Sequence, residues 1–145
     1  MIAAYTVPPI YAAFVWWFST GAVLLLVGRS GRFELSRAFL AVGLLAGSLG
    51  GLALTAGDAS VGGAYTAFTC TILLWAAQEI TFLAGWLTGP RPQQCPVGAT
   101  GGSRLGFALQ AILYHEFALL ACGAAIVALT WASPNQVGLW TFAAL

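Results

Sequence analysis

Four long apolar stretches, almost free of charge, limit most strongly how this chain can fold. They run from about residue 10 to 27, 38 to 55, 62 to 87 and 105 to 131. About 20 apolar residues in a helix are enough to cross the hydrocarbon core of a bilayer, since each residue rises about 1.5 Å. We therefore predict an all-α polytopic membrane protein, with four complete transmembrane helices in a single domain that covers residues 1–145.

A fifth, shorter apolar stretch occupies residues 137–145, after a polar break at residues 132–136. Nine helical residues rise only about 14 Å, which is half of a hydrocarbon core. We expect this stretch to be a partial helix, the beginning of a truncated fifth span. A segment that lies in the membrane interface is the alternative.

Charge is scarce, and its placement predicts an orientation. Only 6% of the residues are charged, against about 25% in a typical soluble domain. The net charge of +1 argues against nucleic acid as a partner. All five cationic residues are arginines in the connectors at about 29–37 and 88–104. By the positive-inside rule these connectors are cytoplasmic, so we expect the amino terminus in the periplasm.

The deep ionisable groups are confined to the third and fourth stretches. The third carries Gln78 and Glu79, and the fourth carries His115 and Glu116. A charged side chain at the centre of a membrane helix costs roughly 2.5–3.5 kcal/mol on insertion scales. In an antiparallel hairpin, Glu79 and His115 would lie roughly 12–15 Å below the same membrane surface. We therefore predict an intramembrane polar site formed by these four residues, with Glu79 beside His115.

Other patterns concern helix packing. Gly43, Gly47 and Gly51 recur at every fourth position of the second stretch, which predicts close packing against a helix of this chain or of another. Trp16 and its neighbours favour an aromatic belt at one membrane surface, with a cofactor-stacking role as the alternative. Ser60 is expected to cap the third helix.

Several longer motifs carry a resemblance to a known family. They cover Phe14–Gly21, Gly63–Cys70, Gln78–Gly85, Thr88–Arg91 with Cys95–Pro96, Tyr114–Glu116 and Leu129–Phe142. In this order they resemble the photosynthetic complex assembly protein family PuhE, found with the reaction-centre genes of purple phototrophic bacteria. Members are roughly twice as long, so the chain is similar to their amino-terminal half. Histidine is common in the family where this chain has Gln78, so position 78 is not expected to be a metal ligand.

The resemblance implies an assembly factor or accessory membrane subunit of the reaction centre and its core light-harvesting antenna (LH1). The implied partners are membrane lipid and the subunits of those complexes, and the implied location is the inner, photosynthetic membrane. The resemblance brings no enzymatic reaction, so we expect no catalytic residues.

Three interpretations of the polar site remain open. The first is a hydrogen-bonded lock between the third and fourth helices. The second is a site for bacteriochlorophyll or haem, with the His115 imidazole as axial ligand. The third, a carboxylate-bridged metal enzyme, normally needs Glu and His three residues apart, whereas His115 and Glu116 are adjacent, so we expect no metal site. A proton or solute pathway is a further use of deep carboxyls.

Overall fold

The computed structural model describes residues 2–28, 34–91 and 93–145, in which α-helices are the only regular secondary structure. The helices are α1 (Ile2–Val27), α2 (Glu34–Thr55), α3 (Val61–Leu83), α4 (Gly101–Thr130) and α5 (Val137–Ala144). The first four are long and apolar enough to cross a membrane. The predicted fold class is therefore confirmed, and the last apolar stretch forms a helix of 8 residues.

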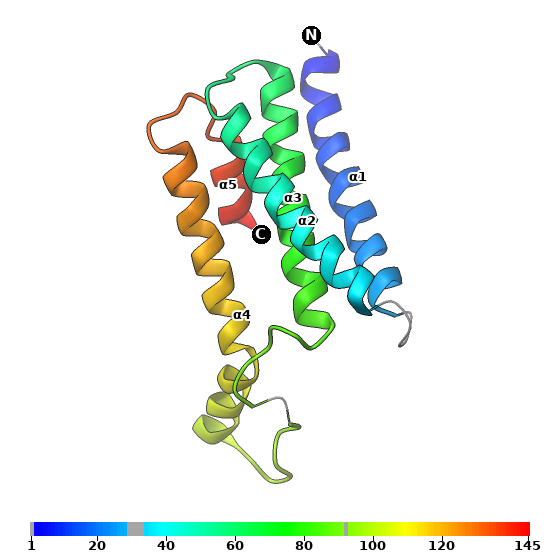
Figure 1. The fold of residues 1–145 in the computed structure, drawn as a ribbon, viewed down its shortest axis with the longest axis vertical. Helices are drawn as coiled ribbons and strands as arrows, with labels where there is room; N and C mark the ends of the chain where they lie inside the picture. The colour runs from blue at the N-terminus through cyan, green and yellow to red at the C-terminus, as the bar shows by residue number, and fades with distance from the viewer. Residues whose placement is uncertain (1, 29–33, 92) are drawn as a thin grey trace.

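Helix α3 is the centre of the bundle. It packs against α1, α2 and α5, and α4 lies on the far side of α2 and α3 from α1 (Figure 1). Ile72, Leu74 and Ile80 of α3 are almost completely buried. Since lipid tails are as apolar as these side chains, close packing and interhelical hydrogen bonds hold such a bundle together.

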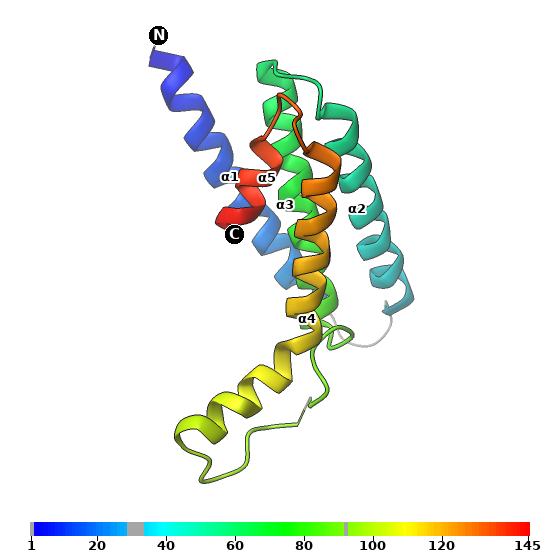
Figure 2. The same cartoon turned by 90° about the vertical axis from the view of Figure 1, so that its left-hand side faces the viewer.

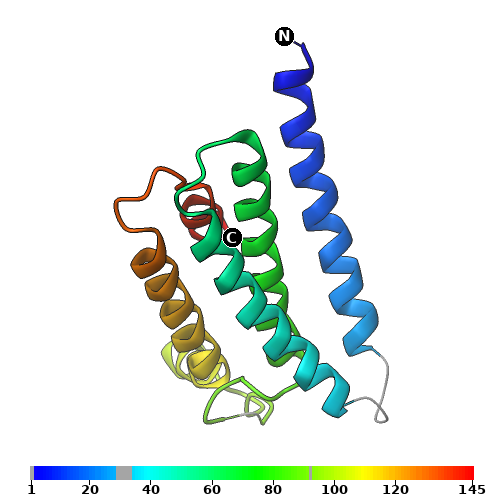
Figure 3. The same ribbon diagram turned by 45° about the horizontal axis from the view of Figure 1, so that its top comes forward.

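Helix α1 begins earlier than the sequence predicts. The expected start was near Ile10, after Pro8 and Pro9, but the helix begins at Ile2 and contains both prolines. Each proline removes one backbone hydrogen bond, yet a membrane offers no water to an unwound segment, so the helix continues through them. As a result, α1 extends beyond the other helices at its amino-terminal end (Figure 3).

The other boundaries differ from the prediction by about one helical turn. Helices α2 and α4 begin at Glu34 and Gly101 rather than near residues 38 and 105. Helix α3 ends at Leu83 rather than near residue 87, because Gly85 adopts a positive φ of 80° that turns the chain away. Arg37 and Arg104 therefore lie inside helices, at the same end of the bundle as Arg91, while residues 29 and 32 lie outside the described residues.

At the opposite end, the turn between α2 and α3 is fixed by Ser60. Its hydroxyl oxygen accepts a hydrogen bond from the Gly63 amide at 3.1 Å, so the predicted cap is confirmed. Its own amide donates to Asp58 Oδ1 at 2.9 Å. Hydrogen bonds from the Ser60 side chain and amide lower the pKa of the Asp58 carboxyl, which favours its anionic form in this turn.

The turn between α4 and α5 is tied to the end of α2. Asn135 is 4% exposed, and its side-chain amide donates to the Thr55 carbonyl at 3.1 Å. Its backbone amide donates to the Ala56 carbonyl at 3.1 Å. These bonds direct the chain back into the bundle, where α5 packs against α3 and α4.

Helix α4 is bent near its middle (Figure 2). The amides of Tyr114 and His115 both donate to the Thr88 carbonyl, at 2.9 and 3.0 Å, and the Gln110 carbonyl accepts from the Arg91 amide at 3.3 Å. In a regular helix the Tyr114 amide would bond to Gln110 instead. Backbone of the α3–α4 loop thus enters the hydrogen-bond ladder of α4, which bends the helix. The half before the bend, residues 101–113, is called the arm below.

Candidate functional site

The candidate site is a seam between α3 and the second half of α4, formed by Gln78, Phe82, His115 and Cys122. Gln78 is 5% exposed, and its Nε2 donates a hydrogen bond to Cys122 Sγ at 2.7 Å. One turn further along α3, the Phe82 ring lies over the His115 ring, with 4.4 Å between the centroids. Gln78 and Phe82 face α4 together because residues four apart share one side of a helix.

The expected contact between Glu79 and His115 is not formed. Within the described parts of the chain, no hydrogen bond or ion pair joins the two side chains, although His115 is buried. Cys122 lies level with Gln78 and His115 lies level with Phe82, so His115 is about one turn nearer the loop than Glu79. Glu79 also points about 100° away from Gln78 around the helix. The predicted depth was wrong because it assumed a straight helix from residue 105, whereas α4 bends at Tyr114 and His115 and the arm before the bend leaves the bundle.

The four predicted polar residues therefore lie in three different surroundings. Gln78 and His115 lie in the seam, Glu79 is half-buried on another side of α3, and Glu116 is exposed. Sequence reasoning missed Cys122 and Phe82 as their partners. The signal was the spacing, since Phe82 follows Gln78 by four residues and Cys122 follows His115 by seven, which places each pair on one helix face.

The loop after α3 also belongs to the site. The backbone groups of Thr88 and Arg91 form hydrogen bonds with the backbone of α4. Gly89 lies so close to α4 that an added Cβ would overlap the Gln110 carbonyl oxygen. The Arg91 guanidinium carbon lies 4.3 Å from the centre of the Phe107 ring, a cation–π contact.

His115 is closely packed, and axial ligation of a bacteriochlorophyll or haem by its imidazole stays a prediction. Its side chain is 7% exposed and covered by Phe82, and its Nδ1 is buried without a partner among the described residues. The Phe82 ring lies over the face of the imidazole, whereas axial ligation would use the lone pair of a ring nitrogen, in the plane of the imidazole. The imidazole is arranged for packing between helices.

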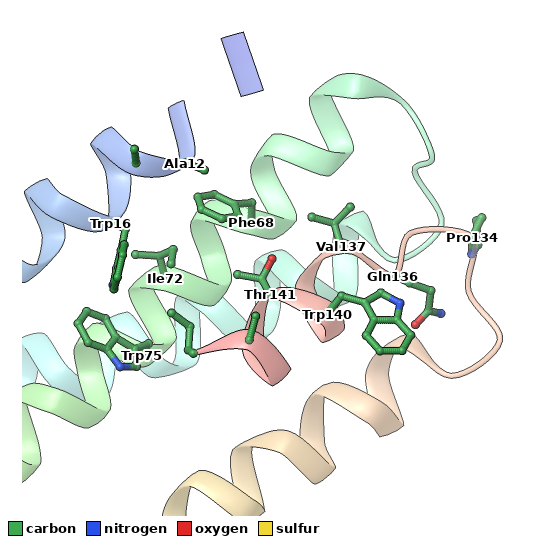
Figure 4. A pocket seen from close by; sticks show the side chains of 13 residues that line it. Ala12, Trp16, Phe68, Ile72, Trp75, Pro134, Gln136, Val137, Trp140 and Thr141 are labelled. Carbon is green, nitrogen blue, oxygen red and sulfur yellow. The ribbon is translucent and has the colours of Figure 1, made fainter. Parts of the chain in front are cut away.

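A groove of about 960 Å³ lies between α1, α3 and α5. Ile72 of α3 and several residues of α5 line it (Figure 4). The lining also includes four aromatic side chains, which are Trp16, Phe68, Trp75 and Trp140. Trp16 lies near the middle of α1 rather than near its end, because the helix begins at Ile2. Glu79 follows Trp75 by four residues, so it lies on the same side of α3, one turn beyond the groove. The groove can accommodate an apolar chain or ring.

The glycine stripe of α2 is only partly used inside this chain. Gly51 packs against Cys70 of α3 so closely that an added Cβ would overlap Cys70 Sγ. Around Gly43 and Gly47, a Cβ would meet no atom within 4 Å among the described residues. Gly51 therefore has an internal partner, and the other two face outward.

Replacing Gln78 by leucine should lower the free energy of unfolding in micelles by about 0.6–1.7 kcal/mol, the range of a side-chain hydrogen bond inside a membrane. Leucine keeps the volume but removes the bond to Cys122. Gln78→Leu and Cys122→Ala can be compared singly and together by unfolding in detergent. Fully additive effects of the two changes would contradict a direct bond between these side chains.

The structure is that of a polytopic α-helical membrane protein. It has four helices long and apolar enough to span a membrane, a seam in which deep polar groups pack together, and a groove on its side. The chain belongs to the family described as "Protein of unknown function (DUF3623)", which matches residues 2–145. It is 38% identical over 136 residues to the "Uncharacterized 30.4 kDa protein in puhA 5'region" of Rhodobacter capsulatus. The match covers 91% of this chain and 50% of that protein, so the chain spans half of its relative's length. No solved structure matches.

Proposed function

We propose that this protein is a non-catalytic assembly factor or accessory subunit of the reaction centre–LH1 complex of purple bacteria. The observation that carries the proposal is the Rhodobacter capsulatus relative, whose name places its gene in the 5′ region of puhA. The sequence motifs support the same conclusion, since they resemble the PuhE family found with reaction-centre genes. Activity and partners of the whole protein belong to this proposal, because the chain covers half of its relative.

The use of the deep polar groups supports a structural role. Gln78 bonds to Cys122, and His115 packs under Phe82 while its backbone amide bonds to the loop. These groups hold α3, α4 and the loop in one arrangement. The groove and the outward glycines of α2 leave apolar surface for other membrane components.

Deletion of the gene in its native host tests the proposal. The near-infrared absorption of the reaction centre and of LH1, per unit of membrane protein, should fall in the deletion strain and recover when the gene is restored. Expression of an unrelated membrane protein from the same promoter is the control. Unchanged absorption under phototrophic growth would contradict a role in assembling or maintaining these complexes.

The pigment-binding alternative makes a different prediction. Because His115 is packed and covered, we expect that His115→Ala leaves the absorption spectrum of the purified protein unchanged. A pigment band that is present in the native protein and lost in this variant would favour ligation by His115. Phe82→Leu, which uncovers the ring without removing it, is the matched comparison.

The proposed location is the photosynthetic inner membrane, with the amino terminus in the periplasm and the arginine-rich end in the cytoplasm. Cys95 is exposed in the loop at this end, whereas Cys122 is buried and Cys70 is half-buried. A membrane-impermeant maleimide should therefore label Cys95 in inverted vesicles, in which the cytoplasmic face is outward. Labelling in right-side-out spheroplasts instead would reverse the orientation.

A further inference from the structure

The arm of α4, residues 101–113, begins where the membrane-spanning part of the bundle ends. A straight helix of 30 residues would be about 45 Å long, while the hydrocarbon core is about 30 Å thick. Because α4 bends, only the half after the bend lies along the bundle, and this half is shorter than the whole helix. His115, just after the bend, packs against Phe82, which lies at the last turn of α3. The arm therefore leaves the bundle at the level where α3 reaches the membrane surface (Figure 2).

One side of the arm is occupied by the loop that precedes it. The Phe107 ring lies under the Arg91 guanidinium, and the Gln110 carbonyl accepts a hydrogen bond from the Arg91 amide. Figure 2 shows this loop running along one side of the arm over its length. The polar backbone of the loop thus marks the side of the arm that faces water.

The other side of the arm carries an apolar stripe. Leu105, Leu109 and Leu113 recur at every fourth position and are 61%, 53% and 36% exposed. They lie roughly 120–160° around the helix from Phe107, on the side away from the loop. A stripe of this kind along a helix at the membrane surface is the pattern of an interfacial helix.

The charged residues of the loop and the arm indicate which kind of membrane surface the leucine stripe contacts. Residues 84–113 contain Arg91 and Arg104 and no acidic residue. Arg104 is exposed in the first turns of the arm, and Arg91 Nε is buried without a hydrogen-bond partner among the described residues. We propose that the arm is an interfacial helix whose leucines enter the membrane surface and whose exposed Arg104 binds the anionic phospholipid headgroups of that leaflet. This inference is independent of the photosynthetic role.

Depth measurements on the reconstituted protein test this proposal. Nitroxide labels are attached singly at positions 103, 105, 109 and 110 in a Cys95→Ser background, since Cys70 and Cys122 are packed. Vesicles contain phosphatidylcholine with or without phosphatidylglycerol. A label at Val42, exposed near the middle of α2, is the reference for full depth. We expect labels at 105 and 109 at one shallow depth below the headgroups, and labels at 103 and 110 in water.

Other results would overturn the proposal. Depth that increases steadily from 103 to 110 would show that α4 is a straight span, and four aqueous labels would show that the arm stands away from the membrane. Arg104→Gln should make the label at 105 shallower only in vesicles that contain phosphatidylglycerol. An unchanged depth in those vesicles would contradict the headgroup contact.

Discussion

Replacing Gly89 by alanine should lower the free energy of unfolding by about 2–3 kcal/mol, the upper part of the range for overpacking. The new Cβ would overlap the Gln110 carbonyl oxygen and lie 2.8 Å from the Ala111 carbonyl carbon. Both are backbone atoms, so the loop must leave α4. The bonds that Thr88 and Arg91 make to α4 would then be lost as well. Unfolding by a denaturing detergent in micelles, followed by circular dichroism, measures the effect.

The matched control for this change is Gly106→Ala. Gly106 lies in the arm, where an added Cβ meets no described atom within 4 Å. Alanine is the better helix former by about 1 kcal/mol, so this variant should be as stable as the native chain or slightly more stable. Equal losses in the two variants would mean that the close approach of Gly89 to α4 is wrong.

Replacing Gly138 by valine should have a similarly large effect, a loss of about 2–3 kcal/mol. Gly138 is the point at which α5 contacts α2 and α3. An added Cβ would overlap Leu52 Cδ2 and lie 3.2 Å from Thr71 Oγ1. The hydrogen bond of 3.2 Å from Thr71 Oγ1 to the Gly138 carbonyl would be strained at the same time. We expect α5 to separate from α3 before the rest of the bundle unfolds.

Two measurements check this prediction. The free energy of unfolding gives the overall loss, and a thiol placed at Thr141, which lines the groove on α5, should react faster when α5 is displaced. Gly47→Val on the outward side of α2 is the control, because a Cβ there meets no described atom within 4 Å. An unchanged reaction rate at position 141 in Gly138→Val would contradict the packing of α5.

The membrane-spanning class could be predicted because span length and charge are properties of the sequence alone. The contacts of the site could not. The bend of α4 takes residues 101–113 out of the bundle, so His115 lies at the level of Phe82, near the end of α3, instead of at the level of Glu79. Adjacent residues such as Gln78 and Glu79 also face different neighbours, and which of them meets α4 depends on the rotation of α3.

The bend in α4 could not be predicted, because the sequence contains no distinctive pattern for it. Residues 88–91 have the glycine and proline of an ordinary loop, and their contacts with α4 are made by backbone groups that every residue has. Gly89 alone is demanded by the contact, and one glycine among the many in this chain is not distinctive. Trp16 was expected near one end of its helix because Pro8 and Pro9 indicated a helix start just after them. The helix instead begins at Ile2 and continues through both prolines, because an unwound segment in a membrane would leave backbone groups without partners.

The most direct test of the proposed function is purification of the tagged protein from photosynthetic membranes of its native host, after mild solubilisation. An unrelated tagged membrane protein of similar abundance is the control. We expect reaction-centre and LH1 subunits to be recovered with the native chain well above the control. Recovery of the protein without these subunits, in membranes that contain them, would contradict it.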